Sequence, residues 1–322
     1  MKKIKIYFED FWDSFDKNDN FVTKILQKEY EVIVDHNPDY LFFSVFGYSH
    51  LKYRNCVKIF YSAENIEPDF NLCDYAIAFQ HLNSHDRYLR FPLYLIAGFD
   101  GLDSKVMERE AILKRKFCNF VYSNSKWADP IRKHFFLQLS KYKKVDSGGL
   151  YLNNIGRQVQ NKIEFIKDYK FTIAFENSSL SGYTTEKIVE PMTVNSMPVY
   201  WGNPDIHLDF NVDSFVHVKG WETIDSAIEE IIRLDRDDDA YMQKLSQPWS
   251  VGDTYHQWEL KLLLFFKNIF DQPIADAKRG TNYGFVRTYR RKQETMGWLF
   301  TRRIMRCTLL GNEFELLVGR KK

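Results

Sequence analysis

The sequence is poor in cysteine, and its cysteines are scattered. Only four occur among 322 residues, with no Cys-x-x-Cys pair and no histidine nearby at metal-ligand spacing: Cys56, Cys73, Cys118 and Cys307. This pattern argues against a disulfide framework and against a structural zinc site. We therefore expect free thiols in a reducing compartment.

Long hydrophobic runs are also missing. No stretch approaches the roughly 20 apolar residues of a transmembrane helix. Residues 1–10 carry charges where a signal peptide has an apolar segment. We expect a cytoplasmic protein that is at most peripheral on the inner face of the cytoplasmic membrane.

Two common nucleotide-binding motifs are absent as well. The chain has no G-x-x-x-x-G-K-[ST], which excludes a P-loop nucleotide hydrolase, and no G-x-G-x-x-G, which argues against a dinucleotide oxidoreductase. Aromatic residues, in contrast, are abundant at 16%. Their faces can serve as platforms for sugars or bases, although many must belong to the core.

Charge is divided unevenly along the chain. Residues 279–322 hold 11 Lys and Arg against 3 Asp and Glu, whereas residues 1–278 hold 34 against 40. In the tail the basic residues alternate with Trp, Phe and Leu at helical spacing, which predicts a basic amphipathic helix. It would lie on a membrane surface or pack on the acidic body. Nucleic acid is not an expected partner, because no folded nucleic-acid motif accompanies the charge.

The body of the chain predicts two successive arrays of alternating strands and helices. Short runs rich in Ile, Val, Tyr and Phe read as buried parallel strands, at residues 4–8, 30–34, 40–45, 57–62, 75–79, 117–122, 171–175, 197–201 and 215–218. Helical patterns lie at residues 21–29, 126–141, 162–169, 223–234, 240–245 and 256–270, and another begins at Thr184.

The polar, glycine-rich segment 145–149 predicts a loop between the two arrays. This places domains at residues 1–149 and 150–278, followed by the basic tail at 279–322. The class is α/β, with two doubly wound domains. In such sheets ligands bind at the carboxyl ends of the strands, so the loops after residues 62, 122, 175 and 201 are the places to look.

The densest group of polar residues follows one of these strands. Residues 171–190 read FTIAFENSSLSGYTTEKIVE: a hydrophobic strand, a polar turn, then a helix. With Thr184 as the N-cap, Glu186 is the second helical residue and Lys187 the third. Anions bind at helix N-termini, and a lysine there is unfavourable unless an anion offsets it. The alternative is an ordinary surface lysine in a first turn.

A second acidic motif has a structural interpretation. Asp237-Asp238-Asp239 contains the Asp-x-Asp pattern with which some nucleotide-sugar enzymes bind Mn²⁺ or Mg²⁺. It lies between helices and far from any strand end, so a helix-capping turn is favoured over a metal site.

Taken together, these motifs resemble glycosyltransferase family 10, the α-1,3/1,4-fucosyltransferases, and especially its bacterial members. The matching stretches cover most of residues 55–270: FEN at 175–177, GYTTEKI at 182–188, PVYWGNP at 198–204, YSAEN at 61–65, NLCDYAI at 71–77, DRYLRFP at 86–92, SN at 123–124, PIR at 130–132 and DSGG at 146–149. A multi-part match of this kind is far more specific than one short motif.

The resemblance implies a GT-B architecture, with two Rossmann-like domains facing a cleft and a basic C-terminal helical tail. The N-terminal half would bind the acceptor and the C-terminal half GDP-β-L-fucose, which reacts with inversion. No cofactor or metal would be required, although stimulation by Mn²⁺ or Mg²⁺ is compatible with the family.

The resemblance also assigns roles to individual residues. Glu64 would be the catalytic general base, because inversion needs a base on the face opposite the leaving group. Glu67 is a rival for this role. The remaining family positions would bind GDP-fucose: Arg132 and Lys187 through the diphosphate, and Glu176, Asn177, Tyr183 and Glu186 through hydroxyls.

Three of these positions have structural alternatives. Glu64 could be a structural carboxylate that caps its neighbours. Glu176 could be a buried structural carboxylate, and Arg132 an exposed residue on a basic helix. Pro191 falls inside the helix that carries Lys187, which predicts that this helix is short.

The implied activity is α-1,3-fucosyl transfer to O3 of GlcNAc or glucose in galactosyl-GlcNAc or lactose acceptors. It would make Lewis X-type glycans on bacterial lipopolysaccharide. Three alternatives remain: another sugar nucleotide as donor, α-1,4 regiochemistry, or a non-catalytic sugar-nucleotide-binding module.

Overall fold

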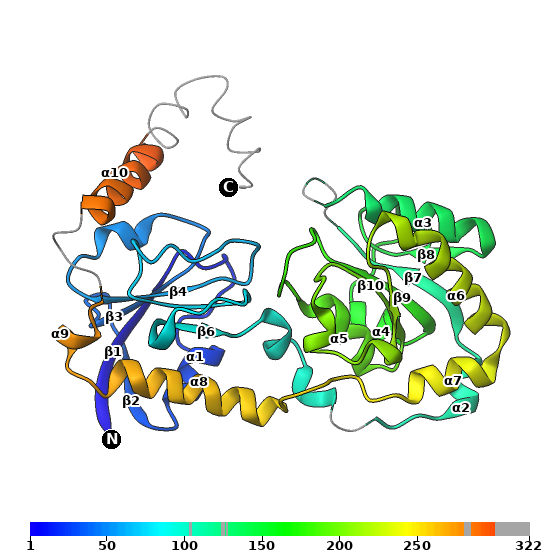
Figure 1. Ribbon diagram of the computed structural model, residues 1–322, viewed down its shortest axis with the longest axis horizontal. Helices are drawn as coiled ribbons and strands as arrows, with labels where there is room; N and C mark the ends of the chain where they lie inside the picture. Colours follow the sequence, from blue (N-terminus) through cyan, green and yellow to red (C-terminus); the bar gives the residue numbers. More distant parts are fainter. Residues whose placement is uncertain (103–104, 124–125, 127, 280–284, 300–322) are drawn as a thin grey trace. The chain divides into compact units, whose positions relative to one another are not determined.

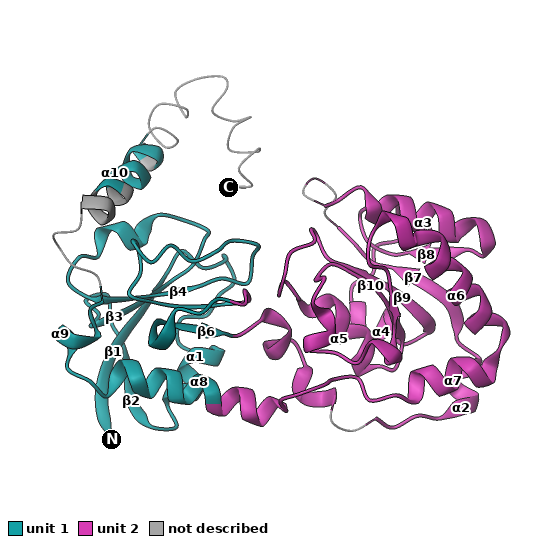
Figure 2. Ribbon diagram, in the orientation of Figure 1, with its two compact units in different colours: residues 1–78, 82–90, 261–322 teal, residues 79–81, 91–260 magenta. Residues whose placement is uncertain are grey.

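The computed structural model describes residues 1–102, 105–123, 126, 128–279 and 285–299. Within these residues the chain forms two compact units (Figure 2). The first contains Met1–Ala78, Leu82–Arg90 and the chain from Lys261 onward. The second contains Phe79–His81 and Phe91–Leu260.

The first unit is built on a six-stranded parallel sheet with the strand order β2-β1-β3-β4-β5-β6 (Figure 1). Its strands are β1 Lys2–Glu9, β2 Tyr30–Val34, β3 Tyr40–Phe43, β4 Val57–Tyr61, β5 Tyr75–Ala78 and β6 Tyr88–Arg90. Every residue of β3, β4 and β5 is buried, as expected for parallel strands with both faces covered. The predicted β2 has the observed bounds, and β6 was not predicted.

Helices cover the faces of this sheet: α1 Phe21–Leu26, α9 Ile274–Ala277 and the C-terminal part of α8 Tyr255–Phe270. The packing of α8 is aromatic, because Phe266 meets Phe42 and Phe270 meets Tyr30 and Tyr40 at ring-centroid distances of 4.4–5.9 Å. The core of the first unit is therefore completed by residues from the far end of the chain.

The second unit contains a five-stranded parallel sheet with the order β11-β10-β9-β7-β8. Its strands are β7 Lys116–Phe120, β8 Val145–Ser147, β9 Tyr169–Phe175, β10 Met197–Trp201 and β11 Val216–His217. Its helices are α2 Arg109–Leu113, α3 Ile131–Tyr142, α4 Lys162–Ile166, α5 Glu186–Thr193, α6 Ile224–Arg236 and α7 Asp238–Ser246. β9 lies at the centre of the sheet and is buried throughout.

The junction predicted at residues 145–149 is wrong. Val145–Ser147 is the edge strand β8, paired with β7 in the second sheet. The first two predicted domains, 1–149 and 150–278, therefore do not match the units: the chain enters the second sheet before β7 and returns to the first unit at Lys261. A three-residue edge strand beside two glycines carries too little pattern to be distinguished from a loop.

The basic tail is described in part. α10 spans Phe285–Leu299, in agreement with the expected helix, and the rest of the predicted amphipathic segment lies outside the described residues. Across the part of the chain that the structure describes, no helix is both long and apolar enough to span a bilayer.

The acidic run before α7 is a helix cap, as predicted. The Asp237 side chain accepts a hydrogen bond of 2.9 Å from the backbone N–H of Ala240. Asp238 and Asp239 occupy the first turn, where carboxylates favour the helix dipole, and they contact Lys170 and Arg109. All three carboxylates therefore have structural partners.

We expect Asp237→Ala to lower the free energy of unfolding by about 1 kcal/mol, because α7 loses its N-cap. Gln243→Ala, an exposed change on the same helix, should stay within about 0.5 kcal/mol of the wild type. Urea unfolding measures both. Equal stability of Asp237→Ala and wild type, combined with loss of Mn²⁺ binding, would contradict the capping role.

Candidate active site

The second unit gathers its polar side chains at the carboxyl end of β9. Glu176 follows the last residue of that strand and is completely buried. Its carboxylate accepts hydrogen bonds from the backbone N–H of Thr185 (2.8 Å) and from the Thr185 hydroxyl (2.8 Å), and it pairs with Lys187 Nζ at 3.2 Å. A buried carboxylate needs such partners, so Glu176 fixes the start of α5.

α5 begins one residue later than predicted. Thr185 is the N-cap with extended backbone, so Glu186 and Lys187 are the first and second helical residues rather than the second and third. The shift follows from Glu176, nine residues earlier in the chain, whose carboxylate accepts from both the N–H and the hydroxyl of Thr185. α5 contains Pro191 and ends after eight residues, the short helix expected.

Lys187 is a fixed cation. Only 13% of its side chain is exposed, and Nζ contacts Glu176, Glu186 (3.1 Å) and the Thr185 hydroxyl (2.9 Å). Burial lowers the pKa of Lys187, but the two carboxylates outweigh burial and hold that pKa above its ordinary value. The ammonium is therefore charged at every physiological pH, and the interpretation of Lys187 as an ordinary surface residue is wrong.

Glu186 is the more accessible of the two acids, with a side chain that is one-third exposed. Burial raises the pKa of Glu186, but the charges of Lys187 and Lys162 lower it further, so the carboxyl stays ionised. An ionised, partly exposed carboxylate can accept hydrogen bonds from hydroxyl groups.

The turn before α5 is held from its other side by Asn203, which follows β10. Asn203 Oδ1 accepts from the Gly182 N–H at 2.8 Å, and Nδ2 donates to the Thr184 hydroxyl at 3.1 Å. Gly182 has a φ of +79°, and a Cβ there would collide with the carbonyl oxygen of Phe79. The next residue, Tyr183, is buried edge-on against Phe79, with ring centroids 5.1 Å apart.

Arg132 lies in the first turn of α3 and reaches the same strand end. Only 1% of the residue is exposed, which rules out the exposed alternative. Nη2 donates to the Phe175 carbonyl (2.9 Å) and to Asn177 Oδ1 (2.8 Å), and the guanidinium lies 4.1 Å from the centre of the Tyr122 ring. Because β7 and β9 are neighbours, the helix after β7 delivers its arginine to the end of β9.

The two cations are thus tied to three consecutive residues. Arg132 bonds Phe175 and Asn177, and Lys187 pairs with Glu176 between them. Fixed cations beside a helix N-terminus form a site for an anion such as a diphosphate.

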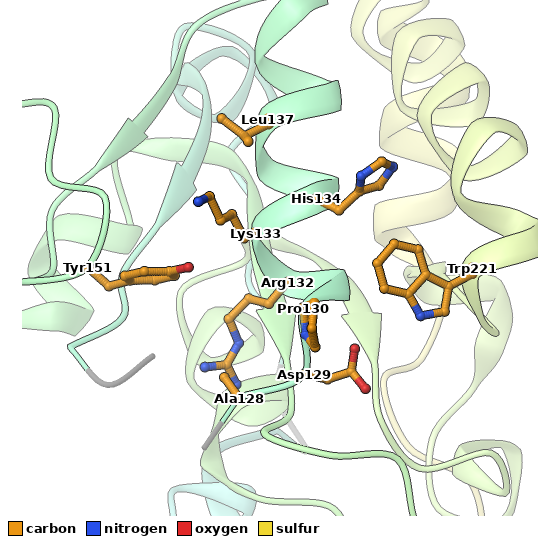
Figure 3. Close-up of a pocket in the computed structure, with 9 residues that line it drawn as sticks. All are labelled: Ala128, Asp129, Pro130, Arg132, Lys133, His134, Leu137, Tyr151 and Trp221. Atoms are coloured by element: carbon orange, nitrogen blue, oxygen red, sulfur yellow. The ribbon is translucent and has the colours of Figure 1, made fainter. Parts of the chain in front are cut away.

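A cavity of about 450 Å³ opens beside Arg132 at the start of α3 (Figure 3). Its lining combines basic, aromatic and small residues: Ala128, Asp129, Pro130, Arg132, Lys133, His134, Leu137, Tyr151 and Trp221. Tyr151 follows β8 and Trp221 follows β11, so both come from carboxyl strand ends. The sequence analysis did not identify either one. Their position after strands was the available signal, but β8 was not recognised as a strand.

Glu64 belongs to the first unit, at the carboxyl end of β4. It is exposed. Its backbone N–H donates to the Ser62 hydroxyl oxygen (3.1 Å), and its backbone carbonyl accepts from the same hydroxyl (2.9 Å). The rival Glu67 is exposed as well. Both carboxylates can reach a bound molecule, so burial does not choose between them.

Glu176 and Tyr183 are buried, as is Arg132, whereas Asn177, Glu186 and Lys187 are partly exposed. The bonds of Glu176 favour the structural alternative. The described residues contain no group of three or more His, Cys, Asp or Glu side chains that could hold a metal ion. Independence from metal stays a prediction.

Comparison with known families agrees with both halves of the chain. A model described as the alpha-(1,3)-fucosyltransferase FucT N-terminal domain matches residues 6–97, and the model of glycosyltransferase family 10 (fucosyltransferase), C-terminal part, matches residues 112–262. Crystal structures of an α1,3-fucosyltransferase are 30–31% identical to this chain. One of these structures, named without a bound nucleotide, superimposes with a TM-score of 0.74 over 88% of this chain and 93% of the other.

The chain belongs to glycosyltransferase family 10.

Its GT-B fold with two Rossmann-like domains is therefore confirmed. The crystal structure described as containing GDP-fucose has a TM-score of 0.72, over 84% of this family 10 chain and 92% of the other. The Helicobacter pylori alpha-(1,3)-fucosyltransferase FucT is 34% identical over 297 residues, which is 77% of this chain and 61% of that protein. A GDP-fucose protein O-fucosyltransferase 3 from Xenopus tropicalis is 30% identical over 189 residues, 51% of this chain and 39% of that protein. The chain thus spans less than two thirds of the length of the Helicobacter pylori and Xenopus tropicalis proteins.

We expect Glu176→Gln to lower the free energy of unfolding by about 3 kcal/mol, since Lys187 loses a buried partner. Glu164→Gln is the matched control, because it breaks an exposed pair with Lys167 in the same unit and should leave the urea midpoint unchanged. Equal midpoints for the two variants would show that the Glu176–Lys187 pair does not organise the site.

Proposed function

We propose that this chain transfers L-fucose from GDP-β-L-fucose to a sugar hydroxyl, with inversion at the anomeric carbon. One observation carries the proposal: two buried cations, Arg132 and Lys187, are fixed to residues 175–177 at the centre of the second sheet. In a family 10 chain with this arrangement, Lys187 and Arg132 would donate hydrogen bonds to a nucleotide diphosphate from fixed positions, while Glu176 and Glu186 balance the charge of Lys187. The relatives named as fucosyltransferases support fucose as the transferred sugar.

In the proposed mechanism the cations offset the charge that develops on the departing GDP. Such stabilisation is strongest when the charged groups are preorganised and shielded from water, as Lys187 and Arg132 are. Glu64 removes the proton from the acceptor hydroxyl as that oxygen attacks the anomeric carbon. No metal is needed in this scheme, because the protein itself supplies two positive charges.

The other family positions divide by burial. Glu186 and Asn177 are partly exposed and would accept hydrogen bonds from donor hydroxyls. Glu176 would not touch the donor but would hold Lys187 in position. Tyr183 would support the site by packing within the turn at Gly182. The cavity beside Arg132 would hold the nucleoside, with the rings of Tyr151 and Trp221 available for stacking.

For the acceptor we propose O3 of GlcNAc or glucose in N-acetyllactosamine or lactose, giving Lewis X-type products on surface polysaccharide. The alternatives are α-1,4 transfer, a different sugar nucleotide, or binding without catalysis. The similarity to protein O-fucosyltransferases adds hydroxyls of peptides as possible acceptors. A panel of donors and acceptors, with linkage analysis of the product, separates these cases.

The tail is proposed to hold the enzyme on the inner face of the cytoplasmic membrane. Its basic residues suit anionic lipid headgroups, and its Trp, Phe and Leu residues suit the interface. Packing on the acidic body of the same chain remains the alternative.

We expect Glu64→Gln to reduce acceptor-dependent GDP release by roughly a hundred- to ten-thousandfold, because the general base is lost. Glu67→Gln is the matched control and should retain activity. Both residues are exposed, so neither change should disturb folding. GDP release with N-acetyllactosamine, measured in EDTA, tests both points. Loss of activity in Glu67→Gln alone would move the base to Glu67, and loss of wild-type activity in EDTA would contradict the metal-free scheme.

Removal of residues 283–322 should abolish co-sedimentation with anionic phosphatidylglycerol vesicles and leave GDP release with a small acceptor intact. Neutral phosphatidylcholine vesicles are the control, and added salt should weaken the binding. If the truncated and complete chains bind anionic vesicles equally, the tail is not the membrane contact.

A further inference from the structure

Aromatic rings are exposed at the carboxyl edge of the first sheet. Trp12, in the loop after β1, is 36% exposed, and Phe46, in the loop after β3, is 48% exposed. A single exposed apolar side chain needs no explanation. Two large rings that follow neighbouring strands at one edge are different, because exposed apolar groups gathered at such an edge mark a binding surface.

The ring of Trp12 is held in place from behind. It packs edge-on against Phe15 (centroids 5.0 Å apart) and tilted against Phe11 (5.8 Å). Phe11 in turn lies parallel to the ring of Tyr61, with centroids 5.9 Å apart. Tyr61 ends β4 and precedes Glu64 by three residues, so one continuous aromatic cluster connects Trp12 with the strand that presents the proposed base.

The loop that carries Phe46 is anchored to the same place by Asp10. The Asp10 carbonyl accepts from the Phe46 N–H at 2.9 Å, and its carboxylate accepts from the backbone N–H groups of Ser49 and His50, both at 2.9 Å. The carboxylate also contacts His50 Nδ1 at 2.7 Å. The Asp10 side chain is only 4% exposed, and the residue has a φ of 61°, an unusual conformation for a residue other than glycine.

The neighbouring Gly47 leaves room for this anchor, since a Cβ there would collide with the Asp10 carboxylate. Asp10, which lies two residues before Trp12 in the chain, therefore fixes the loop that carries Phe46. The loops that carry the two exposed rings are therefore joined through hydrogen bonds to Asp10.

Trp12, Phe46 and Glu64 follow β1, β3 and β4, which are adjacent strands of one parallel sheet, so all three residues come from loops at its carboxyl edge. Because neighbouring strands lie about 4.8 Å apart, the ends of β1 and β4 are separated by roughly 10 Å. A ligand across this edge would meet apolar ring faces at one end and a carboxylate at the other. A sugar has this dual character, with a face of C–H groups that suits an aromatic ring and hydroxyls that suit a carboxylate.

We infer that Trp12 and Phe46 form an acceptor platform, on which the apolar face of an acceptor sugar stacks while a hydroxyl of the acceptor reaches Glu64. Asp10 is the positioning residue that holds the two rings together. The inference rests on the proposed function, because it takes Glu64 to be the base.

The test compares Trp12→Ala and Phe46→Ala with wild type in two assays, one for acceptor binding and one for use of the donor, whose results are independent of each other. Titration with N-acetyllactosamine alone, without donor, measures acceptor binding. GDP release at saturating N-acetyllactosamine, with varied GDP-fucose, measures donor use. We expect each variant to bind the disaccharide about tenfold more weakly, corresponding to about 1.4 kcal/mol, while the KM for GDP-fucose stays unchanged. Trp12→Phe should retain most of the affinity.

Leu264→Ala is the matched control, an exposed apolar residue on α8 of the same unit, and it should bind like wild type. Equal disaccharide affinity of wild type and both alanine variants, or no saturable binding by wild type, would overturn the inference. The inference would also be overturned if the alanine variants kept their disaccharide affinity but were monomers where the wild type is a dimer. The two rings would then serve self-association. Absence of GDP release with intact disaccharide binding would overturn only the proposed function.

Discussion

The buried ion pair between Glu176 and Lys187 is the interaction on which the candidate site depends. A completely buried carboxylate is costly unless it is paired and hydrogen-bonded, and here the partners all come from the start of α5. The pair therefore fixes where α5 begins and which way Lys187 points. Asn177, the residue next to Glu176, bonds Arg132. A single strand end thus orders two cations from two helices, before any ligand arrives.

This arrangement explains why a lysine can occupy the first turn of a helix. The helix dipole disfavours a cation there, but two carboxylates within 3.2 Å of Nζ more than offset it. Such preorganisation matters for a reaction in which charge develops on a leaving group, because the protein does not need to reorient when the bond breaks. By holding Lys187 in place, Glu176 both stabilises the start of α5 and fixes the cation that would face the leaving group.

Much of this architecture could be predicted from the sequence, since buried parallel strands form continuous hydrophobic runs. β2 and β10 have the predicted bounds. The resemblance to the family, and no local pattern, placed Arg132 in one site with Lys187. Predictions failed where local pattern is weak. β8 is three residues long, and α5 begins at a residue decided by a distant carboxylate. Tyr151 and Trp221 were missed because they line a cavity only once β8 and β11 are placed in the sheet. The burial of Tyr183 was not predicted, whereas a buried structural role was one of the two interpretations of Glu176.

The division of α8 between the two units has a consequence for how the protein is made. Phe266 and Phe270 pack against residues of β2 and β3, and the Tyr30 hydroxyl donates to the Asp271 carboxylate at 2.7 Å. The first sheet begins at residue 2, yet this covering leaves the ribosome only after the whole second unit has been synthesised. Domains usually fold in the order of synthesis. Here the unit that begins first must wait, with one apolar face uncovered, while the unit that begins later can fold before it.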